Sequence, residues 1–309
     1  MKYVVSGYIG FDNFGDEAIA CVLSQKLKSE GAEKITLISS NPKKTASLLG
    51  VSSCGMFKFF HALLNSDILI SGGGSLLQDV TSLKSLVYYL GVIYSALILR
   101  KKVQIYAQGI GPINSKIGQI LTKFALKKAE KITVRDSKSQ ELLKSWGIDS
   151  ELVKDPIFEL ELPNKQSKGT VGVQLRNFEG VNEEFLNKLA EEISKRFIDK
   201  KFEILSLQDS IDLEVCNHFA DILKSKGLNN VIVLNKLSIK DVLDKISDLE
   251  YLIAMRFHAN VVGIKAGVKT LAINYDPKVE KLALEYNLPL INLDDEDFSK
   301  QFDRLDLHT

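Results

Sequence analysis

Short apolar runs alternate with longer segments of helical periodicity along this chain, and the alternation constrains the fold more than any other feature of the sequence. In the first half the runs lie at residues 3–5, 35–38, 68–70, 103–107 and 132–134. We expect helices between them, for example over residues 17–29 and 137–146. Strands that alternate with helices in this way form a mostly parallel sheet that is covered on both faces. The first half is therefore predicted to be one α/β unit.

The pattern stops between residues 159 and 170, where Pro, Asn, Gln, Ser, Lys and Gly are frequent, as is typical of a linker. It then starts again, with apolar runs at 171–175, 202–206, 231–234, 249–254 and 270–273. A length of 309 residues suffices for two ordinary domains, and a 45% hydrophobic content supplies a core to each. We predict two Rossmann-like, doubly wound α/β domains that face a cleft, residues 1–164 and 165–309, with their boundary at Lys165.

Composition excludes several functional classes. The net charge is +1 and the charged residues are intermixed, so we expect no nucleic-acid partner. Cys21, Cys54 and Cys216 are far apart and show no metal-ligand or redox spacing. We therefore expect a metal-free, cofactor-free reaction in a reducing compartment. The N-terminus has no secretion-signal pattern, which favours a cytoplasmic location.

Residues 86–102 are apolar for most of their length and end in three basic residues. The segment is too short to span a bilayer, which takes roughly 20 apolar residues. One interpretation is a helix that is buried on several sides. The other is a peripheral contact with a membrane surface, to which residues 56–65, with aromatic and apolar residues at helical spacing, would contribute.

Polar motifs follow the strands, where an open α/β sheet binds its ligands. After the first strand, Gly10 permits a tight turn, and Asn13 and Asp16 are placed to cap the next helix. This loop can contact a phosphate or a sugar, or it can be a capping turn only. After the third run, Gly72, Gly73 and Gly74 are predicted to expose backbone N–H groups directly before a helix. That arrangement forms an anion-binding nest, and a purely structural turn is the alternative.

Further polar residues extend this edge of the first domain. Ser75, Gln78 and Asp79 follow the three glycines and would add side-chain hydrogen bonds to a ligand. The fourth run leads to Gln108 and Gly109, which place one amide and flexible backbone at the same edge. The fifth run leads to Arg135. This arginine either faces the cleft or pairs with Asp136 and a neighbour.

In the second half, four strands end in charged or titratable groups. Arg176, Asp209, the pair Arg256 and His258, and Lys278 follow successive apolar runs. Arginine recognises carboxylate or phosphate with two parallel hydrogen bonds, and lysine adds a compact charge. The second domain is therefore predicted to bind a small, multiply charged anion. His258 is either a packed structural histidine or the group that transfers a proton near neutral pH.

Together, the ordered motifs resemble those of the polysaccharide pyruvyltransferase family, and closely its bacterial members that modify cell-wall polysaccharide precursors. From Gly7 to about Val279 they read "GYIGFDNFGDEAI", "GGGSLLQD", "QGIGP", "VRD", "MRFHA" and "YDPKV". The resemblance implies a GT-B-like pair of domains, phosphoenolpyruvate as the donor, and a pyruvate ketal on a sugar, typically N-acetylmannosamine, as the product. It further implies a part in making the secondary cell-wall polymer that anchors S-layer proteins.

The resemblance also implies roles for individual residues. Arg256, His258 and Lys278 would surround phosphoenolpyruvate, with Arg256 and Lys278 as the anion clamp and His258 as the acid/base group. Arg135 and Arg176 are further anion-site candidates. The acceptor would contact the first domain, at Gly10, Asn13, Asp16, Gly73, Gly74, Ser75, Gln78, Asp79, Gln108 and Gly109.

Two other functions share this architecture, because a fold does not determine a reaction. One is a GT-B nucleotide-sugar glycosyltransferase of cell-envelope synthesis. The other is a non-catalytic protein that binds a glycan or a lipid carrier. If the acceptor is a lipid-linked saccharide, the enzyme works at the inner face of the membrane, and the apolar segments acquire a function.

Overall fold

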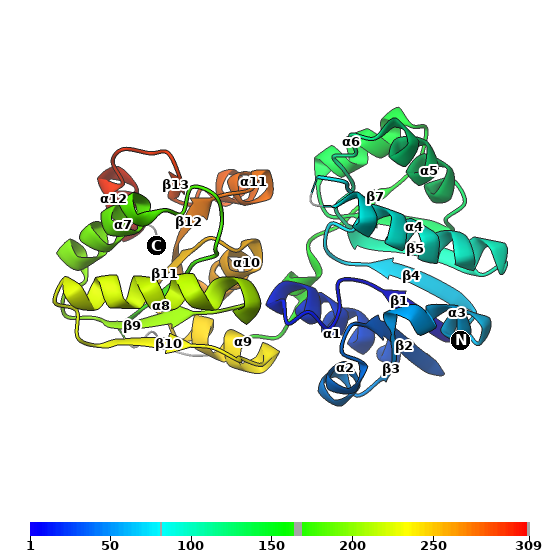
Figure 1. Ribbon diagram of the computed structural model, residues 1–309, viewed down its shortest axis with the longest axis horizontal. Helices are drawn as coiled ribbons and strands as arrows, with labels where there is room; N and C mark the ends of the chain where they lie inside the picture. Colours follow the sequence, from blue (N-terminus) through cyan, green and yellow to red (C-terminus); the bar gives the residue numbers. More distant parts are fainter. Residues whose placement is uncertain (81, 164–168, 308–309) are drawn as a thin grey trace. The chain divides into compact units, whose positions relative to one another are not determined.

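The computed structural model describes residues 1–80, 82–163 and 169–307 (Figure 1). The chain divides into two compact units, Met1–Leu160 and Glu161–Thr309. Each unit contains one parallel sheet with helices on both faces, which confirms the predicted fold class of two doubly wound α/β units. The predicted boundary residue, Lys165, lies outside the described residues.

The N-terminal unit is built on a seven-stranded sheet in the order β3-β2-β1-β4-β5-β6-β7. Its strands are β1 (Lys2–Ser6), β2 (Lys34–Ser39), β3 (Ser52–Gly55), β4 (Ile68–Gly72), β5 (Lys102–Gln108), β6 (Lys131–Val134) and β7 (Glu151–Leu152). Its helices are α1 (Phe14–Ser29), α2 (Pro42–Leu49), η1 (Met56–Lys58), α3 (Phe59–Leu64), α4 (Leu83–Ile98), α5 (Lys116–Leu126), α6 (Ser137–Ser145) and η2 (Pro156–Glu159). Each predicted strand of the first half is present.

Two strands of this sheet were not predicted. Strands β3 and β7 are the two edge strands and have four and two residues. Neither has a buried residue, so neither has the apolar run that marks a central strand. Their short length is typical of edge strands that must not pair with another chain.

The strand order determines which helices share a face of the N-terminal sheet. The chain moves from β1 to β3 in one direction and from β4 to β7 in the other. Because parallel crossovers are right-handed, α1 and α2 cover one face and α3, α4 and α5 cover the opposite face. Helix α4 packs against α3 on one side and α5 on the other. The helix thus has one buried side, whereas its residues Leu83, Val87 and Ile98 are exposed, so it has features of both interpretations of the apolar segment at 86–102.

The C-terminal unit contains a six-stranded sheet in the order β10-β9-β8-β11-β12-β13. Its strands are β8 (Thr170–Gln174), β9 (Lys201–Leu205), β10 (Val231–Leu234), β11 (Tyr251–Ala254), β12 (Lys269–Asn274) and β13 (Leu290–Asn292). Its helices are α7 (Glu183–Arg196), α8 (Asp209–Ser225), α9 (Ile239–Ser247), α10 (Phe257–Ala266), α11 (Pro277–Glu285) and α12 (Ser299–Leu307). Only β13, a three-residue edge strand, was not predicted.

The core of each unit fixes its sheet and so the edge where ligands bind. In the C-terminal unit, Phe202, Phe219 and Phe302 are completely buried between the sheet and its helices. In the N-terminal unit every residue of β4 is buried. The strand order reverses between β1 and β4 and again between β8 and β11. At such a reversal adjacent loops diverge beyond the carboxyl ends of the strands, which is where open α/β sheets bind ligands.

Among the described residues, no helix has both the length and the apolar character needed to cross a membrane.

Candidate functional site

The loop after β1 is held against the end of β2. Gly10 has a φ of +85°, and a Cβ atom there would lie 2.2 Å from Ser39 Oγ, so only glycine fits. Asn13 caps α1 by accepting a hydrogen bond from the Gly15 N–H at 3.0 Å. The capping interpretation of Asn13 is therefore confirmed, and Asp16 lies in the first turn of the same helix.

Glu17 is a buried carboxyl group in this loop region that the sequence analysis did not select. Its Oε1 accepts a hydrogen bond from the Gly10 N–H at 2.6 Å, and 7% of the residue is exposed. Burial raises the pKa of Glu17 to about 7, with smaller upward contributions from Asp16 and Asp12. A glutamate in the first turn of a helix normally complements the helix dipole at the surface. For that reason its position in the sequence gave no sign of burial.

Gly72 ends β4, and Gly73 and Gly74 are not followed directly by a helix, which corrects that part of the prediction. Helix α4 begins only at Leu83, and the Gly73 N–H already donates to the Tyr106 carbonyl at 3.0 Å. Instead the glycines allow α1 to pack closely. A Cβ atom on Gly73 would lie 2.4 Å from Ile19 Cγ2, and one on Gly74 would lie 2.7 Å from Asp16 Oδ1. The structural alternative thus explains this motif.

Ser75 and Arg135, both predicted site residues, are brought together. Arg135 Nη1 donates to Asp155 Oδ2 at 2.6 Å, and Nη2 donates to Ser75 Oγ at 3.3 Å. Both charged side chains are more than nine-tenths buried. The expected partner Asp136 instead caps α6 by accepting from the Ser139 N–H at 2.9 Å. The charge of Arg135 is therefore matched within the protein.

The remaining predicted residues of this edge hold its loops. Gln108 is completely buried and donates to Ser71 Oγ at 3.3 Å, while its Oε1 is buried without a hydrogen-bond partner among the described residues. Gly109 lies against Ser75, because a Cβ atom there would come within 2.7 Å of Ser75 Oγ. Asp79 accepts the backbone N–H groups of Asn114 and Ser115, both at 2.8 Å, and these bonds lower its pKa. Gln78 is half-buried beside it.

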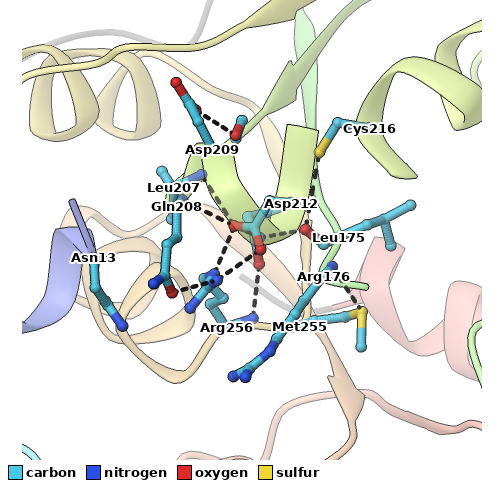
Figure 2. Close-up of polar contacts among 12 residues, drawn as sticks. Asn13, Leu175, Arg176, Leu207, Gln208, Asp209, Asp212, Cys216, Met255 and Arg256 are labelled. Carbon is cyan, nitrogen blue, oxygen red and sulfur yellow. Dashed lines mark hydrogen bonds and ion pairs between the residues drawn. The ribbon is translucent and has the colours of Figure 1, made fainter. Parts of the chain in front are cut away.

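A buried ion pair organises the carboxyl edge of the C-terminal sheet (Figure 2). Arg256 donates through Nε and Nη2 to the two carboxylate oxygens of Asp212, each at 2.6 Å. Asp212 is completely buried on α8 and also accepts the Gln208 N–H at 3.0 Å. Gln174 at the end of β8 accepts the Arg256 backbone N–H at 2.7 Å. The network joins the ends of β8, β9 and β11.

This pairing shows how Arg256, predicted to be part of an anion clamp, is held. Its Nη2 also donates to Gln208 Oε1 at 3.0 Å. Only Nη1 makes no hydrogen bond to a residue that the structure describes. The positive charge of Arg256 is thus balanced by Asp212 before a ligand arrives, and one guanidinium nitrogen is left to contact it.

Arg176 differs from Arg256 because no described carboxylate pairs with it. Its guanidinium carbon lies 5.4 Å from the centre of the Tyr275 ring, and its Nε is buried without a hydrogen-bond partner among the described residues. Its backbone N–H contacts Met255 Sδ at 3.3 Å, which places the residue beside β11 (Figure 2). Arg176 therefore brings an unbalanced positive charge to the carboxyl edge of this sheet.

His258 and Lys278 begin the helices that follow β11 and β12. His258 is the second residue of α10 and is half-buried, with its ring edge-on to Phe257 at 5.1 Å between ring centres. Lys278 is the second residue of α11, and its Nζ lies 3.4 Å from Asp276 Oδ2 in a partly exposed pair. Asp276 also caps α11 by accepting the Lys278 N–H at 3.0 Å. Both predicted residues are thus at the expected edge.

A hollow of about 300 Å³ lies next to these residues at the ends of β12 and β13. Its lining includes the carboxylates Asp276, Glu280 and Asp294 together with the ring of Tyr275. A phosphate in this hollow would meet like charges. An anion is therefore better matched by Arg176 and Arg256 than by the hollow itself.

The two units thus differ in the charge of their ligand edges. The β1 loop in the N-terminal unit has Asp12, Asp16 and Glu17 close together, and its nearby cation Lys44 pairs with Asp12 at 2.6 Å, so the loop does not favour an anion. The C-terminal edge has cationic groups and the N-terminus of α10, both of which favour an anion. Among the described residues, no cluster of three or more His, Cys, Asp or Glu side chains is arranged to hold a metal ion.

Comparison with known proteins finds one matching family model, described as polysaccharide pyruvyl transferase, over residues 13–277. No curated protein matches the chain.

Solved structures of similar fold include Staphylococcus aureus MnaA with UDP, at a TM-score of 0.70, 10% identity, and coverage of 98% of this chain and 87% of that chain. UDP-GlcNAc 2-epimerase from Neisseria meningitidis bound to UDP-GlcNAc is similar at a TM-score of 0.64, 11% identity, and coverage of 100% and 92%. Anabaena HepE in complex with UDP and glucose is similar at a TM-score of 0.63, 10% identity, and coverage of 99% and 89%. At such identities the likeness shows the GT-B fold alone.

The raised pKa of Glu17 makes stability depend on pH. Because the folded protein holds the proton from pH 4.5 to about pH 7 and the unfolded chain does not, the free energy of unfolding should fall as the pH rises through this range. The fall should be up to about 3 kcal/mol. Glu17→Gln should remove this pH dependence. The free energy of unfolding of the variant should therefore exceed that of the wild type most at pH 7 and above. Urea unfolding at a series of pH values measures this.

The matched control is Glu30→Gln, at an exposed position of the same unit, which should keep the wild-type profile. A Glu17→Gln profile that runs parallel to the wild-type profile would show that Glu17 does not hold a proton in the folded state.

Removing Asp212 should leave the buried guanidinium of Arg256 without a counter-charge. We expect Asp212→Ala to lower the free energy of unfolding of the C-terminal unit by about 3–5 kcal/mol. Asp221→Ala removes an exposed carboxylate from the same helix and should change it by less than about 0.5 kcal/mol. Replacing both partners, as Asp212→Leu with Arg256→Met, should cost less than Asp212→Ala alone. Equal effects of Asp212→Ala and Asp221→Ala in urea unfolding would contradict the assignment.

Proposed function

Because the chain belongs to the polysaccharide pyruvyl transferase family, we propose that it transfers pyruvate from phosphoenolpyruvate to a sugar of a cell-wall polysaccharide precursor, with N-acetylmannosamine as the acceptor unit. In this reaction C3 of phosphoenolpyruvate takes up a proton, and C2 becomes electrophilic. One sugar hydroxyl adds to C2, inorganic phosphate leaves, and a second hydroxyl closes the ketal. The two hydroxyls release two protons, of which one balances C3 and the other leaves with phosphate.

The observation that carries the proposal is the unbalanced charge of Arg176 at the carboxyl end of β8. Phosphoenolpyruvate has a carboxylate and a phosphate, and a guanidinium binds either with two parallel hydrogen bonds. Nη1 of Arg256 supplies a further donor, and Lys278 supplies a second charge that a ligand phosphate can draw away from Asp276. The helix dipole of α10 adds partial positive charge at its N-terminus. These groups would stabilise the phosphate as it leaves.

His258 supplies the proton transfer in this proposal. An imidazole can donate and accept a proton near neutral pH, which suits both the protonation of C3 and the deprotonation of a hydroxyl. Its position on the first turn of α10, two residues after Arg256, ties it to the rigid Asp212 network. The proton donor is therefore held by the same elements that hold the anion.

The acceptor sugar is assigned to the N-terminal unit. A neutral sugar does not repel the carboxylates of the β1 loop, and carboxylates accept hydrogen bonds from sugar hydroxyls. Asp16, Ser75 and Gln78 are the side chains proposed to contact it. Gly10, Asn13, Gly73, Gly74, Asp79 and Gly109 shape the surrounding loops.

The proposed reaction has a direct assay. The protein, phosphoenolpyruvate and an acceptor that contains N-acetylmannosamine should release inorganic phosphate and give an acceptor heavier by one ketal-linked pyruvate, without any nucleotide sugar. His258→Ala should lower kcat by about 100-fold or more. His218→Ala, a control at an exposed histidine that pairs with Glu183, should leave kcat unchanged. Mass spectrometry of the acceptor measures the product.

Transfer that requires a nucleotide sugar and ignores phosphoenolpyruvate would instead identify a glycosyltransferase. Phosphoenolpyruvate-dependent transfer at the wild-type rate in His258→Ala would keep the reaction and remove His258 from the mechanism.

A further inference from the structure

Exposed apolar side chains gather on one helical layer of the N-terminal unit. More than half of the exposed large hydrophobic side chains in the described part of the chain lie on η1, α3, α4 and α5. They are Phe57, Phe60, Leu64, Leu83, Val87, Ile98, Ile117, Ile120, Leu121 and Phe124. Phe57 is 98% exposed, Ile98 77% and Ile117 70%. Contiguous apolar surface of this kind marks an interaction site.

The three helices form one continuous surface because aromatic contacts join them. Phe59 of α3 lies edge-on to Tyr88 of α4 at 6.3 Å between ring centres. Tyr94 of α4 stacks on Phe124 of α5, also at 6.3 Å, and its hydroxyl donates to the Leu121 carbonyl at 2.8 Å. We call this surface, from η1 across α3 and α4 to α5, the apolar layer.

Helix α5 shows that the exposure follows a pattern. Its buried residues, Gly118, Thr122, Ala125 and Leu126, face the unit. Its residues 117, 120, 121 and 124 lie on the outer side at the spacing of one helical stripe, and all four are large and apolar. An ordinary surface helix has polar residues there. The outer stripe of α5 is therefore a second apolar face that nothing in the described chain covers.

An exposed lysine lies next to exposed apolar residues in η1 and in the first turns of α4 and α5. Lys58 lies between Phe57 and Phe60, Lys84 follows Leu83, and Lys116 precedes Ile117. None of these lysines forms an ion pair with a residue that the structure describes. The first turns of α4 and α5 follow β4 and β5, so they lie toward the carboxyl edge of the sheet.

The charge of the layer has one sign. Residues 56–66, 83–98 and 116–126, which contain the helices of the layer, include four lysines and no Asp or Glu, whereas Lys102 outside them pairs with Glu130. At the far ends of the helices, Arg100 and Lys127 are exposed, and Lys128 Nζ lies 6.0 Å from the centre of the Phe124 ring. A chain with a net charge of +1 thus has a strongly basic border around its largest gathering of exposed apolar groups.

We propose that the apolar layer binds the surface of an anionic lipid bilayer. Phe and Leu side chains enter the boundary between headgroups and acyl chains, while lysines remain at the level of the anionic headgroups. Each lysine near such a surface contributes about 1 kcal/mol to the free energy of binding. The apolar side chains then anchor the protein without a membrane-spanning helix. This assignment depends only on the layer and is independent of the reaction proposed above.

A second copy of the chain fits the layer less well. Two copies that share the layer in a symmetric dimer would place its lysines opposite the same basic border. Like charges at an interface oppose association, and the layer has no acidic residue to offset them. An anionic bilayer has negatively charged headgroups and an apolar interior. It can therefore contact both the lysines and the exposed apolar side chains of the layer.

Co-sedimentation with vesicles tests the proposal. The full chain should bind vesicles of equimolar phosphatidylglycerol and phosphatidylcholine, and bind pure phosphatidylcholine at least about tenfold more weakly. High salt should weaken binding to the anionic vesicles. The triple variant Lys58→Glu, Lys84→Glu, Lys116→Glu should lower the affinity by about 100-fold or more. A second triple variant, Phe57→Ser, Val87→Ser, Ile120→Ser, tests the apolar contribution and should also bind more weakly.

Matched controls separate the layer from general effects of charge and polarity. Lys226→Glu with Lys240→Glu changes exposed lysines of the C-terminal unit, and Ile198→Ser with Leu284→Ser changes exposed apolar residues there. Both should bind vesicles like the wild type, and unchanged circular dichroism confirms that every variant is folded. No vesicle binding, or equal binding by layer and control variants, would overturn the proposal. So would a wild-type dimer that the layer variants convert to monomers without loss of vesicle binding.

Discussion

The buried ion pair between Asp212 and Arg256 is the constraint on which the C-terminal site depends. Charges removed from water must be matched closely, and here two hydrogen bonds of 2.6 Å join them. The pair fixes the ends of β8, β9 and β11 through Gln174 and Gln208. The N-terminal unit contains a similar buried ion pair between Arg135 and Asp155. In each unit a neutralised arginine therefore supports the carboxyl edge of the sheet, and the principal charge for an anion must come from a different group.

The proposed reaction depends on this difference between arginines that are paired with carboxylates and charged groups that are not. At the carboxyl edge of the C-terminal sheet, no described carboxylate pairs with Arg176, which we propose holds an anionic donor beside the imidazole of His258. In the N-terminal unit the carboxylates around Glu17 leave an edge suited to a neutral sugar. The same unit carries the basic apolar layer on α3, α4 and α5. If the acceptor sugar is carried on a lipid, the unit proposed to bind the sugar is also the unit proposed to contact the membrane.

The sequence predicted the central strands and the edge at which the polar motifs gather, because buried strands need apolar runs and the loops follow them. It did not predict β3, β7 and β13, whose edge positions need no apolar run. Sequence pattern also cannot show pairing between distant residues. The partner of Arg256 lies 44 positions away on α8, and that of Arg135 lies 20 away. The burial of Glu17 and the packing role of Gly73 likewise depend on tertiary contacts.

We propose that Arg176, and not the neutralised arginines, provides the principal charge that binds phosphoenolpyruvate. Calorimetric titration with phosphoenolpyruvate tests it most directly. A hydrogen bond to a charged group contributes about 1.5–3 kcal/mol, so Arg176→Gln should raise the Kd at least about tenfold. Arg304→Gln, an exposed control in the same unit, should bind like the wild type. An unchanged Kd in a folded Arg176→Gln variant would contradict the account.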